Sequence, residues 1–193
     1  MGALGDCELI RSSLLGQPVN ALTSVVFALI GVPLLWRHGL RWLGIGLVAT
    51  GVGSFLFHGP MPAGSEWAHD VSLIWLIALA GALGTRWESR SRLPALLVIG
   101  VIVALVPVAA DALAVALVVA AVGSIVLRRR SLREMAPLAL LALAALLGRL
   151  GATGGPLCDP NSILQLHGIW HIGAALAVAW WGHMHLRLSY RAL

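Results

Sequence analysis

Two histidines lie four residues apart in the almost wholly apolar segment "LQLHGIWHIGAAL". In a helix, His167 and His171 project from the same face, because side chains at positions i and i+4 lie one above the other. Neutral imidazole is a common zinc ligand, and paired histidines at this spacing can bind one ion. Such a pair can also pack, bond to carbonyls or line a proton path, so the spacing alone leaves both interpretations open.

A catalytic zinc ion requires three protein ligands and one open position. His58 is the natural third ligand, because it ends another apolar segment at the same expected depth. Ser54 precedes it by four residues, so its hydroxyl is expected on the same helical face. Asp70 follows a short, turn-rich loop and returns to a similar depth. Its neighbour His69 is an alternative either to Asp70 or to one of the metal ligands. Together these residues favour a metal centre over isolated packing histidines.

The composition indicates an integral membrane protein. Of the 193 residues, 59% are hydrophobic and 11% are charged, with a mean hydropathy of +0.91. A soluble domain has about a quarter of its residues charged. Since a core of this size cannot bury so much apolar surface, the remainder is expected to face lipid. The net charge of +5 comes with short arginine clusters between apolar runs, which argues against nucleic-acid binding and fits topology signals.

The apolar segments predict an all-α protein, a bundle of seven transmembrane helices. A span needs about 20 apolar residues, with a range of about 17–25. The expected spans are 20–36, 42–58, 67–85, 93–109, 111–127, 134–150 and 163–185. The run from 93 to 127 is divided because one helix of that length would measure about 52 Å, and because Pro107 and Asp111 interrupt it. We expect a single domain, 1–193, with a short N-terminal segment, 1–18, outside the membrane.

Arginines mark one side of these seven spans. They follow the first, third, fifth and seventh spans as Arg37 and Arg41; Arg86, Arg90 and Arg92; Arg128, Arg129, Arg130 and Arg133; and Arg187 and Arg191. The opposite side holds only Arg11 and Arg149. The positive-inside rule therefore places the N-terminus outside and the C-terminus in the cytoplasm. The arginine-only, Ala/Gly/Leu-rich composition suggests a bacterial inner membrane, with the candidate centre toward the periplasm.

The outer side also contains the only two cysteines, Cys7 and Cys158. In an oxidising compartment they are expected to form a disulfide that holds the N-terminal segment over the site, and two free thiols are the alternative. The nearby carboxylates Asp6 and Glu8 read by default as a solvated rim. Asn20, at the outer start of the first span, reads as a helix cap.

The ordered set of motifs resembles the alkaline ceramidase family. "SFLFH" (Ser54 to His58), Asp70 and "HGIWH" (His167 to His171) match that family's S-x-x-x-H, Asp and H-x-x-x-H in the second, third and seventh helices. The wider superfamily contains the adiponectin-type (progestin and adipoQ) receptors. The N-terminal "DCE" and "QPVNALTSVVFALIG" resemble the ceramidase branch. Each motif is weak alone, whereas the set in this order, from Asp6 to His171, is specific.

The resemblance implies a zinc-dependent intramembrane hydrolase that cleaves the amide bond of a ceramide-like or other N-acyl lipid. His58, His167 and His171 would hold zinc, and Asp70 would exchange a proton with the zinc-activated water. Ser54 would help to stabilise the oxyanion. The lipid amide substrate would come from the surrounding membrane lipids, and the sequence indicates no protein partner.

Eukaryotic members of that family also carry a calcium site built from acidic N-terminal residues. Asp6 and Glu8 could contribute to such a weak calcium site here. However, Gln17 stands where a glutamate is expected, and the N-terminal spacing is shorter. Both departures weaken the expectation of calcium.

Two other classes of function remain open from the sequence. A lipid-sensing, receptor-like protein is the first, although the inner loops are only a few residues long and offer little surface to a large signalling partner. A proton-coupled transporter is the second. It would need polar residues in both halves of the bundle, whereas the inner halves of the expected spans are nearly all apolar.

Overall fold

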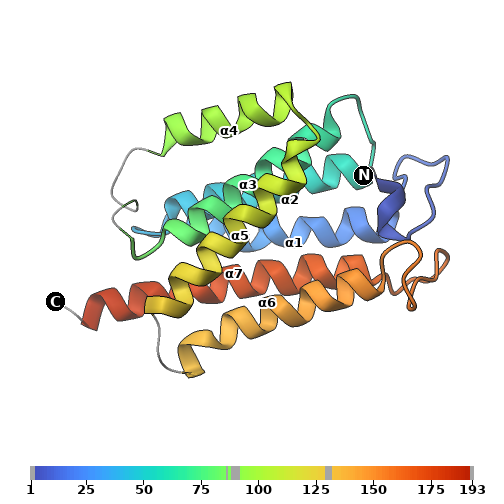
Figure 1. The fold of residues 1–193 in the computed structure, drawn as a ribbon. Helices are drawn as coiled ribbons and strands as arrows, with labels where there is room; N and C mark the ends of the chain where they lie inside the picture. Colours follow the sequence, from blue (N-terminus) through green and yellow to red (C-terminus); the bar gives the residue numbers. More distant parts are fainter. Residues whose placement is uncertain (1–2, 86, 88–91, 129–131, 192–193) are drawn as a thin grey trace.

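The computed structural model describes residues 3–85, 87, 92–128 and 132–191. Within these ranges the chain is all-helical and contains no strand, which confirms the predicted all-α class. A short 3-10 helix, η1 (Ala3–Asp6), precedes α1 (Pro18–Leu34), α2 (Arg41–His58), α3 (Ser65–Ala82), α4 (Leu93–Leu105), α5 (Ala109–Arg128), α6 (Leu132–Leu150) and α7 (Leu166–Arg191) (Figure 1). Of the arginines used for the topology prediction, Arg86, Arg90, Arg129 and Arg130 lie outside the described residues.

Each of the seven expected segments corresponds to one helix, and the bounds differ most in α7, which runs to Arg191 instead of ending at residue 185. The helix α4 ends at Leu105 rather than at residue 109. Val106 leaves the helical region with φ −136° and ψ 71°, because a residue that precedes proline is disfavoured there. The chain then turns at Pro107, and Asp111 lies in the first turn of α5, where the helix N-terminus favours a carboxylate.

Among the described residues, one helical stretch is both long and apolar enough to cross a membrane, namely Ala109–Leu127 in α5. Three shorter apolar helices accompany it, at Pro18–Leu34, Leu93–Leu105 and Met135–Leu150. Only 11% of this stretch is buried, and its exposed large apolar side chains include Val115, Val119 and Leu127.

The helices α1, α2 and α7 form the part of the bundle that holds the candidate site. The helix α1 packs against both α2 and α7, while α3 joins α2 to α5 and α6 packs along α7 (Figure 1). A shared core of buried side chains fills the space between them: Phe27, Leu34, Leu40, Leu43, Leu47, Leu76, Leu83, Ile125, Ala174, Ala175 and Trp181. The helix α4 lies at the outside of α3.

Glycines allow α1 and α2 to approach closely. A methyl group at Gly51 of α2 would lie 2.7 Å from the backbone nitrogen of Ala28, and one at Gly31 of α1 would lie 2.8 Å from Cβ of Leu47. Small residues at such positions are typical where helix backbones pack against one another. This spacing brings Ser24 of α1 within 2.7 Å of Ser54 of α2, so the glycines set the distance across the site.

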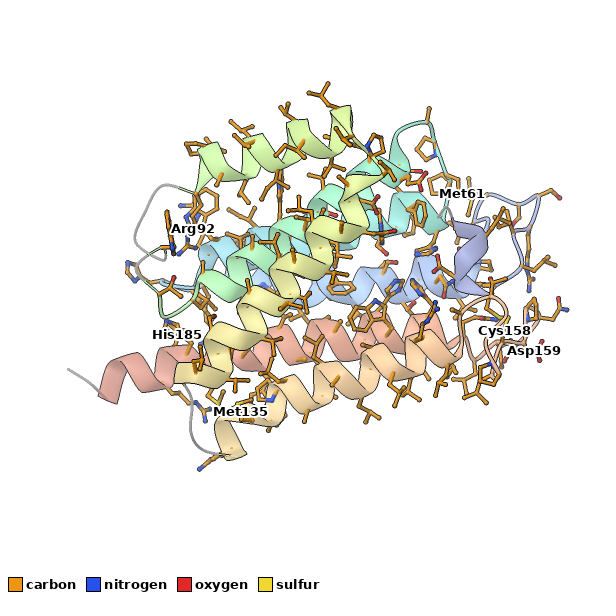
Figure 2. All side chains as sticks on the ribbon, viewed as in Figure 1. Met61, Arg92, Met135, Cys158, Asp159 and His185 are labelled. Carbon is orange, nitrogen blue, oxygen red and sulfur yellow. A yellow bond between two sulfur atoms is a disulfide. The ribbon has the colours of Figure 1, made fainter. Side chains whose placement is uncertain are left out.

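The N-terminal segment is fixed over one end of the bundle. Cys7 and Cys158 form the disulfide that the sequence predicts, with their Cα atoms 5.6 Å apart. Thr153 reinforces the link, because its hydroxyl accepts the Cys7 N–H at 3.0 Å and its own N–H donates to the Gly5 carbonyl at 3.0 Å. The two termini lie at opposite ends of the bundle (Figure 1). Cys158 and Arg92 are likewise at opposite ends (Figure 2).

Replacing Gly51 by alanine should separate α1 from α2. We expect Gly51→Ala to lower the free energy of unfolding by about 1–3 kcal/mol, because the added methyl group meets backbone atoms that cannot rotate away. Thermal unfolding of the purified protein measures the effect. Gly123→Ala is the matched control, since a methyl group there meets no atom within 4 Å and removes only backbone freedom. Equal midpoints for the two variants would contradict the close approach.

Candidate metal centre

Three histidines from two helices converge at the end of the bundle that the N-terminal segment covers. One ligand atom from each of His58, His167 and His171 lies within 4.8 Å of the others. Their ring centroids are 4.6–5.3 Å apart. His58 and His171 are buried, and His167 is 17% exposed. In the described part of the chain, this is the one group of His, Cys, Asp or Glu close enough to hold a metal ion, so the three predicted ligands come together.

Local sequence explains how the rings meet. His58 is the last residue of α2, and His167 lies in the first turn of α7 with His171 one turn later. Gly168 allows α7 to approach α1, because a methyl group there would lie 3.0 Å from Oγ1 of Thr23. The polar end of each helix thus meets the same point, while the apolar remainder packs below it.

Each imidazole meets a different oxygen with its Nδ1 atom. The pairs are His58 with Gln17 Oε1 at 2.7 Å, His167 with Asp6 Oδ1 at 3.3 Å, and His171 with Thr23 Oγ1 at 3.1 Å. Partners of this kind are typical of metal-ligating histidines, in which the second ring nitrogen is held by a carboxylate, a carbonyl or a hydroxyl.

The surrounding bonds decide which nitrogen of each ring carries hydrogen. The Gln17 amide donates from Nε2 to the carbonyls of Ala3 and Glu8 at 2.8 and 2.7 Å, so its Oε1 accepts from Nδ1–H of His58. The Thr23 hydroxyl donates to the backbone of its own helix, for example to the Val19 carbonyl at 2.8 Å. It therefore accepts from Nδ1–H of the ring that it meets.

The remaining nitrogens fit a cation. The Nε2 atoms of His58 and His167 are buried and have no hydrogen-bond partner. With hydrogen on Nδ1, each Nε2 carries a lone pair, and leaving buried acceptors unsatisfied is costly. The Nε2 of His171 lies 3.4 Å from the Ser54 hydroxyl. Three inward lone pairs at this separation are a suitable ligand set for a divalent metal ion.

Ser54 and Asp70, the two predicted catalytic residues, lie in different surroundings. Ser54 is buried beside the cluster, 2.7 Å from the Ser24 hydroxyl. Asp70 lies near the start of α3 and accepts a hydrogen bond from Nδ1 of its neighbour His69 at 2.9 Å. The His69 ring stacks on Phe57 and lies with its centroid 6.1 Å from that of His58. Asp70 and His69 thus form a hydrogen-bonded pair at the edge of the centre.

The two carboxylates considered for calcium have other partners. Glu8 is 4% exposed and accepts the backbone N–H groups of Val19 and Asn20, each at 2.8 Å. Glu8 therefore caps α1. The sequence-based expectation that it forms part of a solvated rim is wrong. Asp6 faces the His167 ring, and burial raises the pKa of its carboxyl to about 6, with His69 acting in the opposite direction. The calcium site stays a prediction.

Sequence reasoning missed the polar face of α1. Asn20 is not the helix cap, because α1 begins at Pro18 and the Asn20 backbone N–H is itself capped by Glu8. Thr23 and Ser24 were not singled out, although both contact His171. The available signal was their spacing: with Gln17 and Asn20 they recur every three or four residues along an apolar helix, as one face requires.

Comparisons with known proteins add no family assignment. A scan against protein-family models gave no match, and a search of curated proteins found no similar sequence.

Gln17 should control metal affinity through His58. We expect Gln17→Leu to weaken zinc binding by about 10–100-fold, because the variant has no acceptor for Nδ1–H of His58. Competition with a chromogenic chelator measures the dissociation constant. Ser13→Ala is a control in the same N-terminal segment, since its exposed hydroxyl bonds only to the nearby Leu15 carbonyl. Unchanged affinity in Gln17→Leu would show that the tautomer of His58 is not set by this amide.

Proposed function

We propose that the chain is an integral membrane hydrolase that uses zinc to cleave the amide bond of a lipid. The observation that carries this proposal is the set of three histidines that each offer a ligand atom within 4.8 Å of the other two, while the Nδ1 atom of each ring contacts its own oxygen partner. A catalytic zinc site has three protein ligands and leaves one position open. The open position distinguishes this arrangement from a closed structural site.

The composition and the exposed surface support a membrane location with seven spans. Apolar side chains that are more than half exposed cover α4, α5 and the turn between them: Leu93, Leu97, Val98, Val101, Leu105, Val108, Val115, Val119 and Leu127. Such a surface is unfavourable in water. Arg92 lies at the end of the bundle opposite Cys158, the residue that is bonded to the N-terminal segment (Figure 2), as expected if the site faces the periplasm and the C-terminus the cytoplasm.

An apolar cavity beside the centre supports a lipid as the substrate. Its volume is about 330 Å³, and its lining comes from α1, α3, α5, α6 and α7. Phe27 and Trp170 both line it. The Phe27 ring meets His171 edge-on with centroids 5.9 Å apart, and Trp170 is its neighbour in sequence. A hydrocarbon chain in this cavity would place a polar amide at the histidines.

Hydrolysis then adds one water across the amide bond. Zinc held by the three histidines would supply a water of lowered pKa and would polarise the substrate carbonyl. Asp70, paired with His69, is the proposed group that takes a proton from the water and gives one to the leaving nitrogen. The hydroxyl joins the acyl carbon, the C–N bond breaks, and a carboxylic acid and an amine result. Ser54 is the proposed polar contact near the reacting carbonyl.

Loss of any one histidine ligand should abolish both metal binding and hydrolysis. We expect the purified protein to contain one zinc per chain and to release fatty acid from a panel of ceramide-like and other N-acyl lipids, with His58→Ala, His167→Ala and His171→Ala inactive. His183→Ala is the control, because this α7 histidine bonds to its own helix at Ala179. Chelation should remove activity, and zinc should restore it. Full zinc content in all three variants would refute the proposal.

The membrane topology predicts where reporter fusions work. Green fluorescent protein joined after Leu193 should fluoresce in a bacterial host, and alkaline phosphatase at that position should be inactive, because a cytoplasmic C-terminus is expected from the arginine distribution. A phosphatase fusion in the α6–α7 loop, at Gly154, should be active. The opposite pattern would contradict the proposed orientation, and a soluble fusion protein would contradict the membrane location.

A further inference from the structure

Asn20 is a buried amide with no hydrogen-bond partner. Its side chain is 0% exposed, and neither Nδ2 nor Oδ1 has a partner in the structure. Buried polar groups in folded proteins are nearly always hydrogen-bonded, so an amide with two unsatisfied atoms requires an explanation. A ligand that arrives during function is one such explanation.

The position of Asn20 on α1 directs it toward the metal centre. Gln17, three residues earlier, bonds to His58, and Ser24, four residues later, contacts both Ser54 and His171. Side chains at these spacings share one face of a helix. The Asn20 carbonyl accepts hydrogen bonds from the hydroxyls of Thr23 and Ser24, and both of these hydroxyls contact the His171 ring. The side chain therefore lies on the face that meets the three histidines.

The neighbouring hydroxyls are already committed as donors. Ser24 donates to the Asn20 carbonyl at 2.7 Å, and one hydroxyl has only one hydrogen. In the 2.7 Å contact between Ser24 and Ser54, the donor is consequently Ser54. Thr23 likewise donates to its own helix. Asn20 Nδ2 is thus the uncommitted donor among these four side chains, and Ser54 can donate to the reacting carbonyl only by giving up its hydrogen bond to Ser24.

We propose that Asn20 is a catalytic residue of the lipid amide hydrolase: its Nδ2–H donates to the carbonyl oxygen of the scissile amide. This inference rests on the proposed function. The bond strengthens as water attacks, because the electron pair of the C=O bond moves onto that oxygen, and it weakens when the carbonyl re-forms as the C–N bond breaks. The Oδ1 atom accepts a hydrogen bond from the attacking water. Both unsatisfied atoms of Asn20 then have partners.

Two variants separate the donor from the volume of the side chain. Asn20→Ala removes both polar atoms, whereas Asn20→Asp keeps the shape and lacks the donor. We expect kcat for a hydrolysable N-acyl lipid to fall by about 10²–10³-fold in both, as for the loss of one oxyanion donor, with one zinc per chain retained. Asn20→Ser, which keeps a hydroxyl donor, should recover part of the loss. Leu22→Ala, an exposed position on the same helix, is the control.

The zinc-free protein provides a readout that is independent of activity. Because the Asn20 side chain has no hydrogen bond to lose, we expect the thermal midpoint of zinc-free Asn20→Ala to stay within about 2 °C of the parent protein, and that of Ser24→Ala to fall further. An unchanged kcat in Asn20→Ala would overturn the proposed role of Asn20 but not the proposed function. A loss of zinc or of stability that parallels the loss of kcat would have the same consequence. A parent protein that hydrolyses no lipid amide would overturn the proposed function, and this inference with it.

Discussion

Everything at the candidate centre depends on where the hydrogen of each imidazole lies. A neutral histidine offers one donor and one acceptor, and only the acceptor can bind a metal ion. Here three oxygens, from an amide, a carboxylate and a hydroxyl, each meet an Nδ1 atom. The bonds of Gln17 and Thr23 to nearby carbonyls leave these oxygens free only to accept. The same three contacts therefore orient the rings and leave the Nε2 lone pairs available to a metal ion.

That constraint explains why the N-terminal segment is held so firmly. Gln17 is completely buried, donates to two carbonyls of the segment and accepts from His58, while its own N–H donates to the His58 carbonyl at 2.8 Å. The disulfide joins the same segment to the loop before α7. Asp6 and His167 thus belong to two segments of the chain that the disulfide links covalently. This N-terminal segment therefore forms the outer wall of the centre.

The sequence predicted the histidines because their spacing follows from one rule of helix geometry, and His58 because its segment ends at the same depth. The cysteine pair followed from compartment and count. By contrast, the role of Gln17 depends on a contact across 41 residues, which no local pattern contains. The capping of α1 by Glu8 was equally hidden, since an acidic residue near a terminus reads by default as solvated. Packing, and not propensity, decided both.

The distribution of polar groups also separates two parts of the molecule with different requirements. At the covered end, almost every buried polar atom is bonded, and the exceptions on Asn20, His58 and His167 gather at one place. Toward the other end, the cavity beside Phe27 and Trp170 has an almost wholly apolar lining. A path for protons would require polar groups along its whole length. A polar centre that adjoins an apolar cavity instead suits a reaction on a molecule that has one polar bond and one long hydrocarbon chain.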